Sequence, residues 1–178
     1  MRCHFGYWVP SFPGALGLFY AAPIRQKLGA KCYFLTGGDR YNRIKDGQFT
    51  INGKSEQFNV VSVDSLTDRL IEKPDVIIVA VKNHHLNEIK ELLNAAASDG
   101  TIIISVLNGI DSEIFLNSLC PRALVIPTVA VGMDAVKVER NLSFTASGKL
   151  LIVTGDNNKN DRVNPNPSMM MKIQRGKT

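Results

Sequence analysis

The chain has 178 residues, of which 44% are hydrophobic, and this length is enough for one domain with a sizeable core. Its formal net charge is +5, but residues 159–178 hold five basic residues and one acidic residue, so this tail supplies +4 of the total. The remaining body is close to neutral, which argues against the broad basic face of a nucleic-acid-binding domain.

Near the N-terminus, Gly14 and Gly17 stand at the start of a predicted helix over residues 15–28. This pattern is the second half of a glycine-rich phosphate loop. Gly14 would let the backbone approach a pyrophosphate, and Gly17 would let the helix pack closely on a strand. The full pattern has another glycine at the position of Phe12. Pro23 interrupts the helix, at a cost of about 3 kcal/mol in a helix interior.

The same region has a second interpretation. Residues 5–24 carry no charge and follow Arg2, as in a signal peptide or a short membrane anchor. Three prolines and three glycines in this stretch argue against a helix that spans a bilayer. We therefore expect a cytoplasmic protein without membrane association, with secretion as the alternative.

The cysteines and histidines do not predict a metal centre. Cys3, Cys32 and Cys120 are far apart, which fits a reducing compartment better than a disulfide framework. No CxxC or HxxxH spacing occurs, so we expect no metal. The adjacent His84 and His85 would point in different directions and are interpreted as a polar helix start.

Further along, strands and helices alternate. Short strands are predicted over residues 31–35, 49–51 and 58–63, and short helices over residues 39–45 and 64–71. Residues 76–81 and 101–106 are apolar, β-branched runs, typical of adjacent strands that are buried on both faces of a parallel sheet. Between them, residues 87–97 form an amphipathic helix. A further helix over residues 111–119 is expected to turn Ile114, Phe115 and Leu119 inward.

The last part of the body predicts strands only. Residues 123–131 form a strand interrupted at Pro127, and residues 142–146 and 149–153 form a hairpin around Ser147 and Gly148. The predicted fold class is therefore α/β, a Rossmann-like doubly wound, mostly parallel sheet with a C-terminal β-hairpin. Residues 157–178 lack an apolar period and are expected to be a disordered polar tail.

With these elements placed, the sequence resembles the N-terminal domain of the ketopantoate reductase (2-dehydropantoate 2-reductase) family over about residues 12–156. The segments that carry the resemblance are GALGLFYAA at residues 14–22, FL before GDRY at residues 38–41, VAVK at residues 79–82, VLNGI at residues 106–110 and PTVAVG at residues 127–132. The family reduces 2-ketopantoate to D-pantoate with NADPH, on the route to pantothenate. Residues 1–156 are then a dinucleotide-binding domain with an atypical first strand over residues 1–13.

The resemblance implies a cofactor site outside the carboxyl ends of the strands. Its residues would be Gly14, Ala15, Leu16, Gly17, Thr36, Asp39, Arg40, Lys82 and Asn108. Lys82 and Asn108 would also stand beside the substrate and the nicotinamide, where an ammonium holds a carboxylate and an amide offers both a donor and an acceptor. The alternative is that Lys82 only starts a helix and that Asn108 and Gly109 only form a turn.

Two neighbouring residues favour different cofactors. An acid such as Asp39 accepts hydrogen bonds from the ribose hydroxyls of NAD, whereas an arginine such as Arg40 holds the extra phosphate of NADP. The family often has an arginine where this chain has Gly37, although Thr36 can also hydrogen-bond a phosphate. We expect NADPH, with NADH as the alternative.

Two features depart from the family. Phe12 and Pro13 replace the end of a short apolar strand and its glycine, and the ring of Phe12 would stand where a pyrophosphate needs bare backbone. The family's C-terminal helical domain, which supplies a general-acid lysine, has no matching segment after Asp156. The resemblance thus implies a truncated chain that is weakly active or inactive alone.

Three functions remain open. The chain is a 2-ketopantoate reductase completed by a homo-oligomer or a separate C-terminal domain, a non-catalytic dinucleotide-binding module, or a reductase of another 2-keto acid. In the first and third cases its partner is a small-molecule 2-keto acid. None of the three involves nucleic acid or a membrane.

Overall fold

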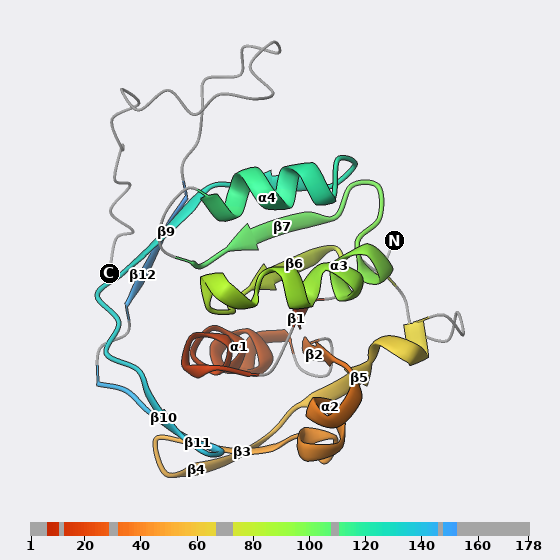
Figure 1. The fold of residues 1–178 in the computed structure, drawn as a ribbon. Coiled ribbons are helices and arrows are strands. Elements are labelled where there is room, and N and C mark those ends of the chain that lie inside the picture. Colours follow the sequence, from red (N-terminus) through yellow and green to blue (C-terminus); the bar gives the residue numbers. More distant parts are fainter. Residues whose placement is uncertain are drawn as a thin grey trace.

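A computed structural model describes residues 7–10, 13–28, 32–66, 73–107, 111–145 and 148–152. Its centre is a sheet of six parallel strands in the order β5-β2-β1-β6-β7-β8 (Figure 1). These strands are β1 (Tyr7–Pro10), β2 (Cys32–Thr36), β5 (Asn59–Ser62), β6 (Val76–Val79), β7 (Ile102–Ser105) and β8 (Leu124–Ile126). Numbered within the sheet the order is 3-2-1-4-5-6, which is the Rossmann arrangement with its switch point between β1 and β6. The predicted fold class is therefore confirmed.

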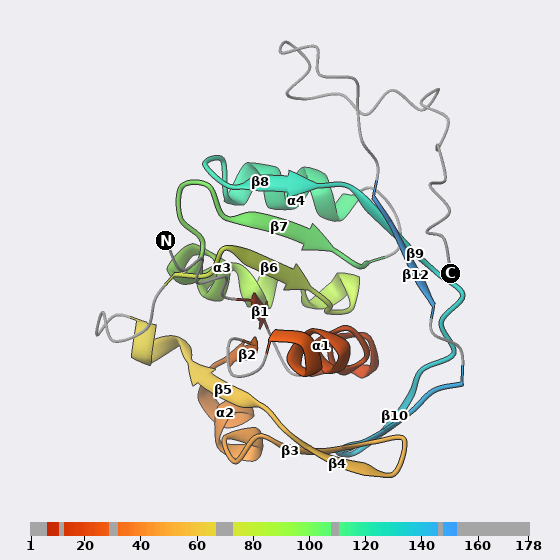
Figure 2. The same ribbon diagram turned by 180° about the vertical axis from the view of Figure 1, so that it is seen from behind.

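Helices follow four of these strands. They are α1 (Ala15–Leu28), α2 (Gly38–Ile44), α3 (Lys90–Ala96) and α4 (Asp111–Leu119). Two 3-10 turns, Asn83–His85 and Asn87–Ile89, lead from β6 into α3, so the predicted helix over residues 87–97 begins as a tighter coil. Seen from behind, β8 lies in front of α4, which covers the opposite face of the sheet (Figure 2).

The two faces of the sheet bury two separate cores. In β6, Ile77 and Val79 belong to the core beneath α3 and α4, and Val76 and Ile78 belong to the core beneath α1. All four positions are buried, which explains why the strand shows an unbroken apolar run instead of an alternating one. β6 and β7 pair in parallel from Val76↔Ile102 to Val79↔Ser105, as predicted.

A second, smaller sheet lies against the α1 side. It has the order β10-β11-β3-β4, with β10 (Val136–Val138), β11 (Asn141–Ser143), β3 (Gln48–Ile51) and β4 (Lys54–Gln57). Buried residues of β3 and β11, among them Phe49 and Leu142, pack in the same core as Leu18 of α1. Strand β4 was not predicted, because its sequence KSEQ has no apolar period.

The C-terminal hairpin is present but is built from other strands than predicted. β10 and β11 form it, and β12 (Lys149–Ile152) instead pairs antiparallel with β9 (Thr128–Val131). The predicted pairing of residues 142–146 with 149–153 is therefore wrong. In the observed register Leu150 lies opposite Ala130, and both pack against the α1-side core. Burial of Leu150 thus favours the distant strand over the neighbouring one.

Other predictions need smaller corrections. Ile114 of α4 was expected to face inward but is 59% exposed, and Leu116 is the fully buried residue of this helix. Phe115 and Leu119 pack against the first core, as predicted. The predicted helix over residues 64–71 begins as a 3-10 turn at Val63–Leu66, and residues 67–71 lie outside the described part.

Two prolines near the N-terminus lie within regular elements, one in β1 and one in α1. Pro10 is the last residue of β1 and pairs in register only with Leu35 of β2, so it ends the central strand without interrupting it. Pro23 lies within α1 and is exposed, so the helix passes through it as predicted. No described helix is both long and apolar enough to cross a membrane.

Burial also settles the state of two cysteines. Cys32 and Cys120 are free and buried, and they lie in different cores. Burial raises the pKa of the Cys32 thiol to about 11, so this thiol is neutral near pH 7. Both behave as small core residues and not as nucleophiles.

Candidate functional site

Most of the predicted site residues lie at one edge of the central sheet. Gly14 follows β1, Thr36 ends β2, and Lys82 follows β6. Because these strands are parallel and adjacent, their carboxyl ends meet at the same edge, beside the switch point between β1 and β6. Ligands of open α/β sheets bind at this position. Asn108 lies outside the described residues.

Gly14 begins α1, and its carbonyl accepts a hydrogen bond from the N–H of Leu18 at 3.1 Å. Its backbone is not left-handed, and a Cβ added there would meet only the carbonyl of Ala80, at an ordinary 3.8 Å. Neither the turn nor the packing of the described chain therefore requires glycine at this position. The open space beside Gly14 fits a ligand that approaches the backbone closely.

The first turn of α1 contains Ala15, Leu16 and Gly17. The N–H groups of such a turn have no partner within the helix and carry the positive end of its dipole. Ala15 and Leu16 are half-buried against the α1-side core, and Gly17 is buried. This turn can hold an anionic group through its backbone.

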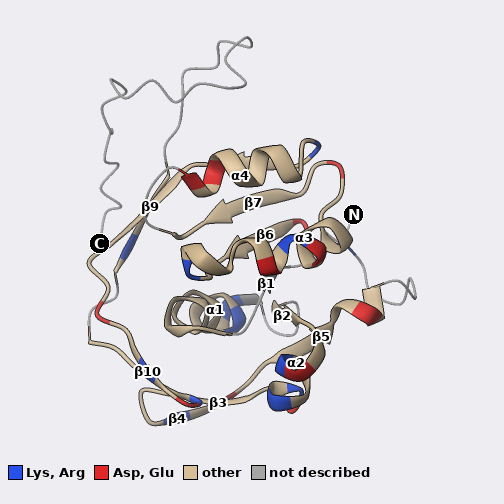
Figure 3. Ribbon diagram, viewed as in Figure 1, with Lys and Arg blue, Asp and Glu red and all other residues tan. Residues whose placement is uncertain are grey.

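An open cleft of about 490 Å³ lies next to the end of β2. It is lined by Thr36, Gly37, Gly38, Asp39, Arg40, Arg43, Val63, Glu88, Glu91 and Leu92. Acidic and basic positions occur on both α2 and α3 (Figure 3). The cleft thus brings together the end of β2, the start of α2 and the segment that follows β6.

Thr36 is the most informative residue of this cleft. It is only 1% exposed, and its Oγ1 has no hydrogen-bond partner among the described residues. A buried hydroxyl without a partner is uncommon, because desolvation without a hydrogen bond costs about 1–3 kcal/mol. Thr36 also belongs to the wall of the open cleft.

Asp39 and Arg40 both line the cleft, but they differ in their contacts. Asp39 is exposed. Arg40 Nη2 lies 2.6 Å from Glu88 Oε2, in an ion pair that spans the cleft from α2 to the segment before α3. His85 Nδ1 lies 2.7 Å from the other oxygen of Glu88. The hydrogen bond with His85, followed by that with Arg40, lowers the pKa of Glu88.

The sequence analysis did not single out Glu88. It belongs to a stretch predicted as an amphipathic helix, where a glutamate is normally part of the solvated face. Arg40, the partner of Glu88 across the cleft, is 48 residues away in the chain, so no local pattern could reveal this pair.

Lys82 is exposed and stands where the first 3-10 turn begins, and its carbonyl accepts the N–H of His85 at 2.8 Å. It therefore starts a turn, as the alternative interpretation has it. Its position after β6 also leaves its ammonium free to reach solvent at the sheet edge. The two interpretations of Lys82 are compatible.

A buried polar chain lies at the end of β7 and was also not predicted. Ser105 Oγ and Ser112 Oγ are 2.8 Å apart, and Ser112 Oγ donates to Glu113 Oε2 at 2.8 Å. The hydroxyl of Thr128 donates to the carbonyl of Ser105. These contacts join the end of β7, the start of α4 and β9, so they fix the two ends of the segment that connects β7 to α4.

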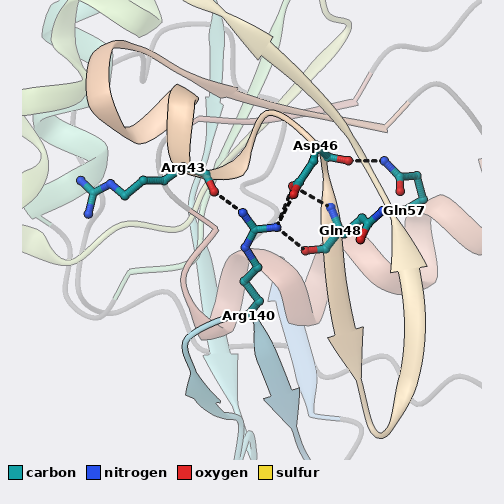
Figure 4. A network of polar contacts seen from close by, with 5 residues as sticks. All are labelled: Arg43, Asp46, Gln48, Gln57 and Arg140. Atoms are coloured by element: carbon teal, nitrogen blue, oxygen red, sulfur yellow. Dashed lines mark hydrogen bonds and ion pairs between the residues drawn. The ribbon is translucent and has the colours of Figure 1, made fainter.

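Helix α2, which carries Asp39 and Arg40, is held at its C-terminal end by residues of the second sheet. Arg140, just before β11, donates through Nη1 to both carboxylate oxygens of Asp46 at 2.7 Å and through Nη2 to the carbonyl of Arg43 (Figure 4). Gln57 of β4 donates to the carbonyl of Asp46. The C-terminal end of α2 is thereby tied to both hairpins of the second sheet.

Among the described side chains, no group of three or more His, Cys, Asp or Glu residues could hold a metal ion.

Several known proteins are similar to this chain. The family model described as ketopantoate reductase PanE/ApbA matches residues 13–158. The 2-dehydropantoate 2-reductase of Nostoc sp. is 27% identical over 114 residues, which cover 64% of this chain and 35% of that protein.

Solved structures of low sequence identity share the fold. The dimeric ketopantoate reductase of Staphylococcus aureus matches with a TM-score of 0.65 at 20% identity, over 85% of this chain and 48% of that one. A D-mandelate dehydrogenase in a ternary structure with NADH and anilino(oxo)acetate matches with a TM-score of 0.63 at 19% identity, over 82% of this chain and 47% of that one. The chain thus spans about half or less of the length of these relatives.

Proposed function

Because this chain belongs to the ketopantoate reductase family, we propose that the edge formed by the carboxyl ends of β1, β2 and β6 binds a reduced nicotinamide dinucleotide. The observation that carries the proposal is the buried Oγ1 of Thr36, which lies on the wall of the cleft and has no hydrogen-bond partner among the described residues. The open backbone at Gly14 and the helix start behind it support the proposal independently.

Each part of the site has a distinct proposed role. The backbone from Gly14 to Gly17, including the N–H groups of Ala15 and Leu16, holds the pyrophosphate. Thr36, Asp39 and Arg40 hold the ribose at the adenine end. Lys82 and Asn108 lie towards the nicotinamide and the substrate.

We propose the reduction of 2-ketopantoate to D-pantoate as the reaction of the whole protein. The bound cofactor supplies the hydride to the ketone carbon. The ammonium of Lys82 binds the carboxylate of the 2-keto acid as a point charge and orients the ketone towards the nicotinamide side. NADPH is the cofactor of the family, and both NADPH and NADH are candidates for this chain.

Protonation of the ketone oxygen needs a general acid, which typically contributes roughly 10²–10⁴ in rate. The family's acid is a lysine for which these 178 residues offer no matching segment. We propose that these residues bind the cofactor and that fast reduction of 2-ketopantoate needs the general-acid lysine of the family's helical domain. The fold shared with a D-mandelate dehydrogenase supports another 2-keto acid as the alternative substrate.

The test is a fluorescence or calorimetric titration of the full chain with NADPH and with NADH, for the wild type and for Thr36→Val. Thr36→Val removes one hydrogen bond to the ligand, so affinity should fall about fivefold. The same change also removes an unpartnered buried hydroxyl from the free protein, so the melting temperature without ligand should stay or rise. A purely structural role for Thr36 would instead lower the melting temperature.

Thr50→Val, in β3 and outside the cleft, is the matched control and should leave affinity unchanged. A third variant, Phe12→Gly, should bind more tightly, because it restores the bare backbone of the loop's first glycine. The change at Phe12 concerns a residue outside the described ones. A wild-type chain that binds neither dinucleotide would refute the proposed function.

A further inference from the structure

The charges of the cleft do not favour a phosphate. Its lining residues include three acids, Asp39, Glu88 and Glu91, and two bases, Arg40 and Arg43, which gives a formal charge of −1. An additional phosphate on the ribose would therefore enter a cleft with more carboxylates than guanidinium groups. A neutral ribose would not meet this repulsion.

Glu88 is held in place on both sides. One carboxylate oxygen contacts Arg40 at 2.6 Å and the other contacts His85 at 2.7 Å. His85 lies in the 3-10 turn after β6 and Arg40 lies in α2, so the contacts of Glu88 connect both walls of the cleft. The carboxylate of Glu88 is thus already paired with the guanidinium of Arg40, which a phosphate would need as its own partner.

Arg43, the second arginine of the cleft, also has a hydrogen-bond partner within the protein. Arg43 Nε donates to the carbonyl of Asp39 at 3.3 Å, within its own helix. Because the carboxylate of Asp39 is exposed at the start of α2, it remains available to the hydroxyl groups of a ribose.

We propose that Glu88 selects NADH over NADPH in this cleft, by occupying Arg40 and by repelling a 2′-phosphate. The inference rests on the proposed function, since it requires that the cleft bind the adenine end of a nicotinamide dinucleotide. NADPH must displace Glu88 from Arg40 before its 2′-phosphate gains a cation. NADH presents a 2′-hydroxyl that donates a hydrogen bond to a carboxylate such as Asp39.

The test is the ratio of the dissociation constants for NADPH and NADH, measured by titration calorimetry on the full chain and on Glu88→Gln. The wild type should bind NADH more tightly, and Glu88→Gln should lower the ratio about tenfold, mainly by tightening NADPH. Glu91→Gln removes the same charge from the same cleft. Since no ion pair joins Glu91 to Arg40 in the described part of the chain, its ratio should change much less.

A second substitution separates the role of Arg40 from a general charge effect. Adding Arg40→Ala to Glu88→Gln should cancel the gain for NADPH and return the ratio towards that of the wild type, because the released guanidinium is the group that the phosphate contacts. All of these residues are at least partly exposed, and circular dichroism spectra should confirm that each variant is folded.

The outcomes distinguish the two proposals. A wild type that binds dinucleotides but prefers NADPH, or a ratio that Glu88→Gln leaves unchanged, overturns the role of Glu88 and leaves the proposed function intact. A wild type that binds neither dinucleotide overturns both. A lower ratio in Glu88→Gln that returns with Arg40→Ala supports both.

Discussion

A single guanidinium, that of Arg140, joins parts of the chain that lie far apart in the sequence. Asp46 is 94 residues away and the carbonyl of Arg43 is 97 residues away. The two hydrogen bonds from Arg140 to the Asp46 carboxylate hold the pKa of that carboxyl below its usual range. The site at the start of α2 therefore depends on a residue that is itself outside the cleft.

Replacing Arg140 by alanine should raise the pKa of Asp46 towards the ordinary value of an aspartate. A carboxyl whose pKa is lower in the folded state contributes stability above its unfolded pKa, and this contribution is lost as the pH falls through the folded pKa. The stability difference between wild type and Arg140→Ala should therefore be present at pH 7 and disappear in acid. An NMR titration of Asp46 and urea unfolding at both pH values measure this.

The control is Arg122→Ala, which removes an arginine from a more exposed ion pair with Asp99. It should leave the titration of Asp46 unchanged. If Asp46 titrates identically in wild type and Arg140→Ala, the contacts in Figure 4 do not persist in solution.

At the scale of elements, the turn between α2 and β3 shows how closely two segments meet. Gly47 has a φ of 66°, and a Cβ added there would lie 1.9 Å from the carbonyl oxygen of Phe58. The N–H of Phe58 donates to the carbonyl of Gly47 at 2.8 Å, so the contact is between two backbones and cannot be relieved by a side-chain rotation. This turn ends α2 and positions β3 beside β4.

Gly47→Ala should therefore destabilise the protein by about 2 kcal/mol or more, from the left-handed backbone and the clash together. Gly53→Ala is the matched control. Gly53 also has a positive φ, 78°, but no atom of the described residues lies within 4 Å of its added Cβ, so only the backbone cost of about 1 kcal/mol applies. Equal losses for the two variants in urea unfolding would show that the close contact at Gly47 is absent.

Local patterns predicted the strands that have apolar runs. β6 and β7 were both predicted from their apolar runs alone. Every residue of β6 is buried, whereas in β7 Ile103 and Ser105 are buried and Ile102 and Ile104 are half-buried. Pairing was harder to predict. β12 pairs with β9, where Leu150 is half-buried against the α1-side core, and that packing depends on where α1 lies. The prediction that Ile114 is buried was wrong, because helical spacing alone does not say which face of a helix meets the sheet.

The candidate site was likewise predicted in part, where local motifs were sufficient. Its position at the carboxyl ends of the strands, and residues such as Gly14, Thr36 and Arg40, followed from motifs. The ion pair between Arg40 and Glu88 could not be predicted, because charged side chains on a helix surface usually face solvent and their partners are set by the tertiary fold.

At the scale of the whole molecule, stability should differ between the central sheet and the strands around it. Every residue of β6 is buried, whereas Val136 and Val138 of β10 are 62% and 65% exposed. The central sheet has helices packed against it, and β10 lies at the edge of the second sheet. The strands at that edge have fewer buried contacts to lose when they open.

Native-state hydrogen exchange should therefore be slowest at the amides of β6 and β7 and faster at those of β10. The expected order follows from burial, since exchange in buried strands needs large-scale unfolding, and edge strands open locally. Peptide-resolved mass spectrometry can measure it on the unliganded full chain. Protection of β10 equal to that of β6 would mean that the two sheets unfold as one unit.

The position of β1 has a consequence for how the protein is made. β1 is made before β2 and β6, and it lies between these two strands in the middle of the finished sheet. A nascent chain can pair β1 with β2 early, but the other edge of β1 has no partner until Val76 emerges. During that interval the edge is a row of open N–H and C=O groups, which are prone to pair with other chains. The strands β6, β7 and β8 join the described sheet only through β1, so the second half of this fold assembles late during synthesis and depends on four residues that are made earlier.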